Sequence, residues 1–419
     1  MDKRVVVTGM GVVTPLGHNI DTLWNNLLKG ECGIDYISSF PTEGMVVKIA
    51  GEVKDFNPAD FGIEPHFSRK QDKFTIYAVA AAKQAMDQSG LCAVEGENQN
   101  IDPFRLGVYV GSGVGGLNTL CNEAIKMHEE GTKWVSPLLV PTMIPNIASG
   151  NIAIRNHAFG PCIPIATACA TGTHSIGEAY RAIKHGYADA IITGGAEAPI
   201  TPLGIAGFAN AKALSRAENP KYASLPFNTN RAGFVMSEGA GVMVLEEYEH
   251  AKARGAEIIA EVVGYGNTCD AFHITAPRHD GSTQSKAIEI AITEAGFSMD
   301  KDNVYINAHG TGTNRNDTSE TEAIKIAMGE AAAHRAHISS TKSQLGHMLG
   351  AAGGVEAIIS ILTLKNGIIP PTINLDSQDP ECDLDYTPNT PVEADITLAV
   401  SNSLGFGGHN GCLAFRKAE

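Results

Sequence analysis

The stretch PIATACATGTH, from Pro164 to His174, decides the fold because it joins a short apolar run to a helix through a turn of small residues. After Ala170 the apolar positions recur at helical spacing, so a helix is predicted from this point. Cys169 therefore lies where a strand passes into a helix. Unpaired N–H groups and the helix dipole at such a junction favour the reactive thiolate, and the same N–H groups can hold an oxyanion. The alternative is a small buried core cysteine.

The composition is typical of a globular protein with many tight turns, since the 419 residues include 45 glycines and 43% hydrophobic residues. This length allows two or three domains, or one large duplicated α/β unit. The net charge of −15 argues against a general nucleic-acid binder, yet it allows a small basic patch for an acidic partner. We find neither an apolar run long enough to span a bilayer nor a signal peptide, so no membrane contact is expected.

Cysteine usage points to a reducing compartment. The cysteines show neither paired metal-binding spacing nor a dense disulfide framework. We therefore expect free thiols and a cytoplasmic protein. The eight cysteines stand at positions 32, 92, 121, 162, 169, 269, 382 and 412.

Apolar runs and helical patterns alternate in two similarly ordered halves, with Gly255 as the boundary. In residues 1–255 we expect strands beginning near 4, 105, 190 and 239, and helices at 21–30, 73–89, 171–183 and 246–254. In residues 256–419 we expect strands at 257–265, at 304–307 and twice within 396–415, and helices at 283–295, 319–328 and 346–364. The last of these helices is rich in small residues, which predicts a buried central position. The repeated order indicates an ancient duplication.

Three further motifs place polar residues in turns after apolar strands: NAHGTGT at 307–313, TKSQLGH at 341–347 and SNSLGFGG at 401–408. A lone histidine is usually an ordinary surface or core residue. His309 and His347 differ by context, because a neutral imidazole in such a turn can stabilise negative charge on a thioester oxygen. That is what acyl transfer or decarboxylation requires. Lys342 is either a solvated surface lysine or a buried one paired with a carboxylate such as Glu356.

Together with the cysteine turn, these motifs closely resemble the β-ketoacyl-acyl-carrier-protein synthases of the condensing-enzyme superfamily, and most of all the type II elongating synthases of fatty-acid synthesis. The likeness extends from RVVVTGMGVVTPLG near the N-terminus to GFGGHNGCLAF near the C-terminus. It implies an α/β protein with the thiolase fold, in which two duplicated halves form five layers in the order α-β-α-β-α. Residues 1–255 would carry the nucleophile and residues 256–419 the two histidines. The resemblance also implies a homodimer.

The resemblance assigns the chemistry residue by residue. Cys169 would take the acyl chain from acyl carrier protein as a thioester. His309 and His347 would bind the malonyl thioester and promote loss of CO₂, and the enolate would then extend the chain by two carbons. Backbone N–H groups of Cys169 and Phe406 would form the oxyanion hole, and Phe406 would gate the acyl pocket. Lys342 would act structurally and electrostatically.

Binding positions follow from the same resemblance. Thr311 and Thr313 would hydrogen bond the phosphopantetheine arm that the carrier protein brings, although forming a turn is the plainer interpretation. Val114 would line the acyl tunnel and leave room for a medium or long chain. The resemblance also implies that no cofactor beyond this arm is required.

Two weaker assignments concern charged and polar groups. A basic rim would meet the acidic carrier protein, against the plain alternative of solvated surface cations. A set of oxygen ligands would hold a structural monovalent cation, against ordinary hydrogen bonding. The rim consists of Arg69, Lys70 and Lys212. The cation ligands would be Asn307, Glu356, Ser401 and Asn402.

Asn314, Arg315 and His409 depart from the usual pattern of the family. These departures affect what can be expected of local loop packing and of the fit of the substrate. Four alternatives remain: a polyketide-type ketosynthase of the same chemistry, a chain-length factor without a nucleophile, a degradative thiolase and a carrier-protein docking module. The intact set of Cys169 and both histidines argues against the chain-length factor. Cys412 is the one candidate for the second cysteine of a thiolase.

Overall fold

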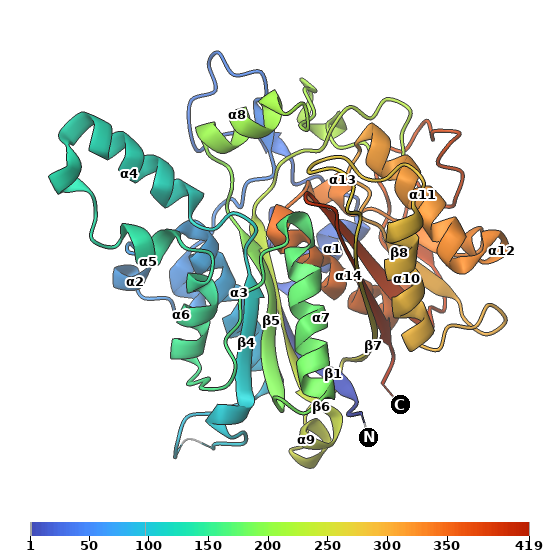
Figure 1. Cartoon of the computed structure of the whole chain (residues 1–419), viewed down its shortest axis with the longest axis horizontal. Coiled ribbons are helices and arrows are strands. Elements are labelled where there is room, and N and C mark those ends of the chain that lie inside the picture. The colour runs from blue at the N-terminus through green and yellow to red at the C-terminus, as the bar shows by residue number, and fades with distance from the viewer. Residues whose placement is uncertain (1, 97, 419) are drawn as a thin grey trace.

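A computed structural model describes residues 2–96 and 98–418. Its main sheet has nine strands in the described residues, in the order β4-β5-β6-β1-β7-β13-β12-β8-β9 (Figure 1). The strands of the first half are β1 (Val5–Val13), β4 (Leu106–Gly111), β5 (Ala190–Glu197) and β6 (Gly239–Glu247). Those of the second half are β7 (Ala260–Cys269), β8 (Val304–Asn307), β9 (His337–Ser339), β12 (Leu398–Gly405) and β13 (His409–Arg416).

Helices pack in three layers around the two halves of this sheet. The outer face of the first half is covered by α3 (Lys73–Ser89) and α6 (Ile147–Arg155). Between the halves lie α7 (Thr171–Lys184) and α14 (Ala352–Asn366), which contact strands of both (Figure 1). The outer face of the second half is covered by α10 (Ser282–Glu294) and α11 (Asn314–Met328). The predicted five-layer arrangement is therefore confirmed.

Shorter elements complete the described chain. The remaining helices are α1 (Ile20–Leu28), α2 (Pro65–Ser68), α4 (Leu117–Glu130), α5 (Leu139–Met143), α8 (Pro202–Asn210), α9 (Tyr248–Ala253), α12 (Glu330–Ala333) and α13 (Lys342–Leu345). The remaining strands are β2 (Asp35–Tyr36), β3 (Ile49–Ala50), β10 (Ile368–Ile369) and β11 (Val392–Glu393). None of the helices in the described part of the chain is long and apolar enough to span a bilayer.

Glycines allow the two central helices to approach each other and the sheet. A Cβ atom on Gly172 of α7 would lie 2.5 Å from the backbone N of Gly354 in α14. A Cβ on Gly241 of β6 would lie 2.3 Å from the backbone N of Val355. Backbone packed at this distance leaves no space for a side chain, so the small residues predicted for a central helix are a steric requirement.

Strand pairing repeats in the two halves. β4 and β5 are parallel, whereas β5, β6 and β1 pair antiparallel; β8 and β12 are likewise parallel, whereas β12, β13 and β7 pair antiparallel. The halves join where Val5, Val6 and Val7 of β1 pair with β7. We propose that the boundary between residues 1–255 and 256–419 falls just before β7.

Two predicted helix boundaries are wrong. α11 begins at Asn314, five residues before the predicted start, because the buried Asp317 carboxylate accepts hydrogen bonds from the Thr311 and Gly312 N–H groups and fixes the helix entrance. α14 begins at Ala352, six residues after the predicted start, because Gly346 and Leu349 have φ values of 70° and 45°, which interrupt a right-handed helix.

Candidate active site

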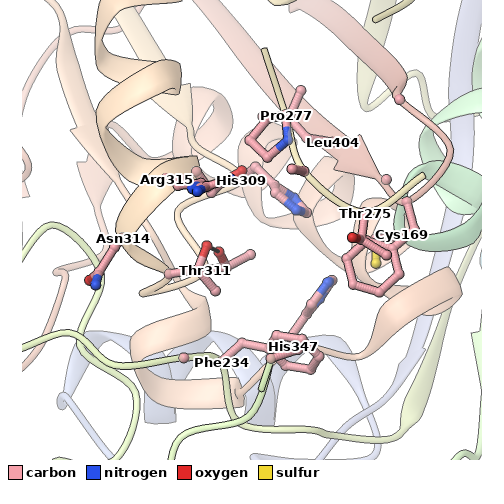
Figure 2. A pocket seen from close by; sticks show the side chains of 18 of the residues that line it. Cys169, Phe234, Thr275, Pro277, His309, Thr311, Asn314, Arg315, His347 and Leu404 are labelled. Atoms are coloured by element: carbon pink, nitrogen blue, oxygen red, sulfur yellow. Dashed lines mark hydrogen bonds between the residues drawn. The ribbon is translucent and has the colours of Figure 1, made fainter. Parts of the chain in front are cut away.

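A cavity of about 690 Å³ opens between the two halves and contains the groups that the motifs predicted. Cys169 comes from the first half, whereas His309 and His347 come from the second. Figure 2 shows the sulfur and both imidazoles around the same space. Thr311, Thr313 and Phe406 also line this cavity. The structure thus brings together segments that are far apart in the sequence.

Cys169 lies in a single 3₁₀ turn, Ala168–Ala170, directly before α7. Ala168 has a φ of 50°, a conformation that is unfavourable for a residue with a side chain and that turns the chain sharply into the helix. The thiol is 8% exposed and faces the cavity. On its other side Gly405 packs so closely that a Cβ there would lie 3.3 Å from the Cys169 backbone N.

Burial decides the protonation state of this thiol. Desolvation raises the pKa of Cys169 to about 12, and the charge of Lys342 and the Phe406 backbone N–H lower it less than burial raises it. Burial therefore opposes the thiolate that the start of the helix was expected to favour.

His309 lies in the turn between β8 and α11, and a carboxylate holds the backbone of that turn. Glu320 accepts hydrogen bonds from the His309 N–H at 2.7 Å and from the Gly310 N–H at 2.8 Å. Burial raises the pKa of Glu320 to about 7, an effect that these two N–H groups and the charge of Lys342 reduce. The imidazole itself remains available, because its buried Nδ1 has no hydrogen-bond partner within the described chain.

His347 is anchored through its backbone on both sides. Its N–H donates to Val235 O at 2.7 Å, and its carbonyl accepts from Ser237 N–H at 2.9 Å. Its ring packs edge-on against Phe234, with centroids 5.1 Å apart, and lies nearly perpendicular to the His309 ring at 5.2 Å. Neither rotation nor displacement is easy for an imidazole packed in this way.

Both imidazoles are neutral in the free protein. Burial, followed by the positive charge of Lys342, lowers the pKa of His309 and of His347 well below the usual value. A neutral ring carries one N–H, so it can donate a hydrogen bond to an oxygen that gains negative charge. The lowered pKa values therefore favour the protonation state that the predicted chemistry needs.

Lys342 and Glu356 form a buried ion pair, since the Lys342 ammonium donates to Glu356 Oε1 and the two residues are 2% and 1% exposed. Lys342 starts α13 and Glu356 lies in α14, so the pair ties the segment before His347 to the central helix. Of the two predicted interpretations of Lys342, the structure has the buried one. Its charge acts on the thiol and on both histidines.

Phe406 begins the turn between β12 and β13, where Gly407 and Gly408 have φ values of 90° and 79°. The Phe406 N–H lies close enough to the Cys169 sulfur to stabilise its negative charge. The ring stacks on Phe208 of α8 with centroids 6.1 Å apart. The amide therefore acts on the thiol as an oxyanion-hole donor would, and the oxyanion and gating roles of Phe406 stay predictions.

Comparison with known proteins identifies the family. Residues 2–251 match the family "Beta-ketoacyl synthase, N-terminal domain", and residues 259–376 match "Beta-ketoacyl synthase, C-terminal domain". The chain belongs to the β-ketoacyl synthase family. It is 49% identical over 418 residues to a 3-oxoacyl-[acyl-carrier-protein] synthase 2 of Staphylococcus aureus (strain COL), covering 100% of this chain and 99% of the relative.

Further relatives agree over the full length. A protein of the same name from Synechocystis sp. (strain ATCC 27184 / PCC 6803 / Kazusa) is 46% identical, covering 100% of this chain and 99% of the relative. A solved β-ketoacyl synthase from Burkholderia phymatum STM815 superposes with a TM-score of 0.90 at 34% identity, and both chains are covered completely. The predictions of the thiolase fold and of an elongating, condensing acyltransferase of fatty-acid synthesis are confirmed.

Among solved structures, type II polyketide enzymes also share this fold. A complex titled "AntDE:AntF (apo): type II PKS acyl-carrier protein in complex with its ketosynthase bound to the hexaketide" has a TM-score of 0.91 at 33% identity, with complete coverage of both chains. Its identity is lower than that of the synthases named above.

The β-ketoacyl synthase cavity runs from the reacting groups to the surface along the segment that follows His309. His309 and Thr311 are 3% and 5% exposed, Thr313 is half-buried, and Asn314 and Arg315 are exposed. The Thr311 and Thr313 hydroxyls lie 3.0 Å apart. Two hydroxyl groups side by side on the wall suit amide groups of an entering arm, and this binding role stays a prediction.

The predicted basic rim is not gathered around the cavity. Lys212 follows α8, is exposed and lines the cavity, whereas Arg69 and Lys70 follow α2, are exposed and do not line it. Val114 is also absent from the lining. Val114 is 41% exposed and lies in a loop, and its backbone N–H donates to the Glu197 carboxylate. For this single chain, docking at Arg69 and Lys70 and the tunnel role of Val114 stay predictions.

Four buried oxygen atoms fit the predicted cation. Asn307 and Ser401 are direct neighbours in the parallel pairing of β8 and β12. Each of the four predicted ligands carries a buried oxygen without a hydrogen-bond partner in the described chain, and such atoms are costly unless an ion or water satisfies them. The atoms are Asn307 Oδ1, Glu356 Oε2, Ser401 Oγ and Asn402 Oδ1.

Sequence reasoning missed two buried carboxylates that position this site. Glu320 holds the His309 turn, and Glu197 accepts hydrogen bonds from Ser112 Oγ, Gly113 N–H, Val114 N–H and Gly350 N–H. Glu197 therefore joins the loop after β4 to the segment that follows His347. The signal available was its place at the end of an apolar strand, AIITGGAE, where a lone carboxylate needs internal donors.

Proposed function

We propose that the protein extends acyl chains held on acyl carrier protein, with Cys169 as the nucleophile and His309 and His347 as the groups that stabilise the malonyl enolate. The observation that supports this most strongly is that one buried cavity holds the thiol, two neutral imidazoles and the Phe406 amide. A condensing acyltransferase that elongates fatty acids needs these groups together.

In the first half-reaction the Cys169 sulfur attacks the acyl thioester carbonyl. The oxygen becomes an oxyanion that the Cys169 and Phe406 N–H groups receive, and neither N–H is among the turn and loop backbone hydrogen bonds of the described residues. The C–S bond to the carrier arm then breaks, and the proton from Cys169 leaves with the arm's thiol. The high pKa of Cys169 is consistent with transfer of this proton during attack instead of before it.

In the second half-reaction a malonyl thioester occupies the arm's place. Hydrogen bonds from the neutral His309 and His347 rings stabilise charge on the thioester oxygen while the C–C bond to the carboxylate breaks and CO₂ leaves. The enolate carbon then attacks the acyl carbonyl on Cys169. The C–S bond to Cys169 breaks, the thiolate takes one proton from solvent water, and the β-ketoacyl product remains on the carrier arm.

Intact-mass measurement tests this function directly. The wild-type protein incubated with acyl carrier thioesters should gain the mass of the acyl group, lose it on addition of malonyl carrier protein and release a β-keto product two carbons longer. Cys169→Ala should gain no mass, whereas Cys269→Ala, which changes an exposed thiol, should behave as wild type. Loading of Cys169→Ala, or an adduct that malonyl carrier protein cannot discharge, contradicts the proposal.

A homodimer is part of the proposal. α4 and α5 extend from the body of the molecule (Figure 1), and large apolar side chains there and on nearby segments are exposed. An exposed apolar surface of this kind is typical of an interface. Sedimentation analysis should give twice the monomer mass. The exposed residues include Met127, Trp134, Val140, Ile154, Phe159 and Ile163.

We further propose that the four unpartnered oxygens hold a monovalent cation and that the protein works in the cytoplasm. The bound ion would neutralise the free oxygen of Glu356 and brace β8 against β12, without contact with the reacting carbon. Replacing K⁺ and Na⁺ by a bulky organic cation should lower the unfolding temperature of the wild type, and Ser401→Ala should reduce this difference. Free cysteines in the described chain are consistent with a reducing compartment.

A further inference from the structure

Two arginines at the entrance of α11 differ sharply in their surroundings. Arg231 is 6% exposed, and its guanidinium donates to Asn228 O, to the Asp379 carboxylate and to Asn314 O. Arg315 is exposed, lines the cavity, and its side chain makes no hydrogen bond or ion pair with the described residues. Arg231 therefore braces the fold, whereas Arg315 has no structural partner.

The position of Arg315 also costs the helix some stability. It is the second residue of α11, where the positive end of the helix dipole disfavours a cation. None of the described carboxylates forms an ion pair with its guanidinium. The Asp317 carboxylate accepts hydrogen bonds from the backbone N–H groups of Phe227, Thr311 and Gly312. Asp270 lines the cavity, and its carboxylate accepts hydrogen bonds from the Arg278 backbone N–H, Thr283 Oγ1 and Asn410 Nδ2. An anion from outside the chain would complete this charge.

The order of residues along the wall gives the place of that anion. From the buried His309 the lining passes Thr311 and Thr313 and reaches Asn314 and Arg315 at the surface. Figure 2 shows Thr311 between Cys169 and Asn314, with Arg315 on the same side as Asn314. An arm whose thioester lies at Cys169 and whose amides lie at the threonines presents its outer end to Arg315.

Resting on the proposed function, we propose that Arg315, with Lys212, binds the phosphodiester that joins the phosphopantetheine arm to the carrier protein. Lys212 lines the same cavity and precedes Ala213, whose carbonyl accepts from the Phe234 N–H. Figure 2 places Phe234 across the cavity from Arg315. Lys212 has a φ of 58°, an unfavourable conformation of the kind found at functional sites. Two exposed cations that line one cavity suit a phosphodiester.

Two small thioester donors separate the effect of the phosphate from that of contacts with the carrier protein. They are the acyl thioester of 4′-phosphopantetheine and the same thioester of pantetheine. The acyl chain is the one that the wild type accepts fastest from carrier protein. The rate of Cys169 acylation, followed by intact mass, should be about fivefold to tenfold higher with the phosphate for the wild type. Arg315→Gln should bring this ratio close to one, Lys212→Gln should lower it partly, and Arg315→Lys should retain most of it.

Arg216→Gln is the matched control, because Arg216 is an exposed arginine on the same segment as Lys212 that does not line the cavity. It should keep the wild-type ratio. The inference is overturned if the wild type ignores the phosphate or if Arg315→Gln slows both donors equally, which indicates a structural role. It is also overturned if Arg315→Gln slows only acyl carrier protein, which indicates contact with the protein's acidic surface. Failure of the proposed function is distinct, since the wild type would then load neither the carrier thioester nor the small donors.

Discussion

The turns before α7 and α14 are built alike in the two halves and carry different chemistry. Each contains a residue with positive φ, Ala168 at 50° and Leu349 at 45°, in a 3₁₀ turn that leads into a central helix. Cys169 follows the strained residue and faces the Phe406 amide, whereas His347 precedes it and faces His309. The reactive side chain thus stands after the strained residue in one turn and before it in the other. The first position holds the nucleophile Cys169, and the second holds His347, which stabilises charge.

The largest effect on activity should come from removing the imidazole of His309 or of His347. His309→Ala and His347→Ala should each lower condensation by at least about 100-fold, because each removes a donor to the developing enolate oxygen. Acylation of Cys169 should stay within about threefold of wild type, since the oxyanion hole belongs to the other turn. Release of CO₂ from malonyl carrier protein and intact mass separate the two steps.

His279→Ala provides the control for the histidine variants, because His279 is exposed and does not line the cavity. It should condense at the wild-type rate. Normal CO₂ release by either His309→Ala or His347→Ala removes that ring from the mechanism. Equal loss of acylation and decarboxylation would show that the two turns do not divide the chemistry.

The ion pair behind the His347 turn should have the next largest effect. Lys342→Met leaves Glu356 buried without its partner, which should lower the free energy of unfolding by about 3–5 kcal/mol. The double variant Lys342→Met/Glu356→Leu should recover most of this loss, because it leaves no unpaired charge. Denaturant titration of the wild type, the two single variants and the double variant gives the coupling energy. A single variant as stable as wild type contradicts the structural role of the pair.

The fold was predictable from the sequence where local pattern and global packing agree. The helix at 73–89 matches α3 residue for residue, since a glycine follows it, and β5 begins at the predicted residue 190, where an apolar run starts. The start of α14 was not predictable, because the chain breaks at Leu349 and not only at a glycine. Nothing in the identity of a leucine signals a positive φ.

The reacting residues of the site were found from their motifs, but their electrostatics were not. The sequence shows that Cys169 precedes a helix, whereas the pKa depends on how much of the rest of the chain covers the sulfur. Glu320 was missed for a related reason. It lies eleven residues after His309, and its hydrogen bonds to that turn depend on a helix start that was predicted too late.

The protonation state of the cysteine turn can be measured by alkylation. Because the pKa of Cys169 is raised to about 12, the thiolate fraction should increase about tenfold for each pH unit between pH 7 and pH 10. The rate of reaction with a small alkylating agent should therefore rise over this whole range without a plateau. Peptide mass analysis distinguishes Cys169 from the exposed Cys269, which serves as the reference for reagent reactivity. A plateau below pH 9 would show that the turn stabilises a thiolate after all.

The smallest effect should come from cations that lie outside both turns. Arg69→Gln and Lys70→Gln each remove one exposed charge that does not line the cavity, so each should raise KM for acyl carrier protein about twofold to fivefold and leave kcat unchanged. The difference from wild type should shrink at high salt, because screening weakens exposed charge pairs in both proteins. Lys301→Gln changes an exposed lysine in the segment between α10 and β8 that does not line the cavity; it is the control and should change neither constant. A lower kcat in Arg69→Gln or Lys70→Gln would show that these surface charges affect the chemical steps at the two turns as well as docking of the carrier protein.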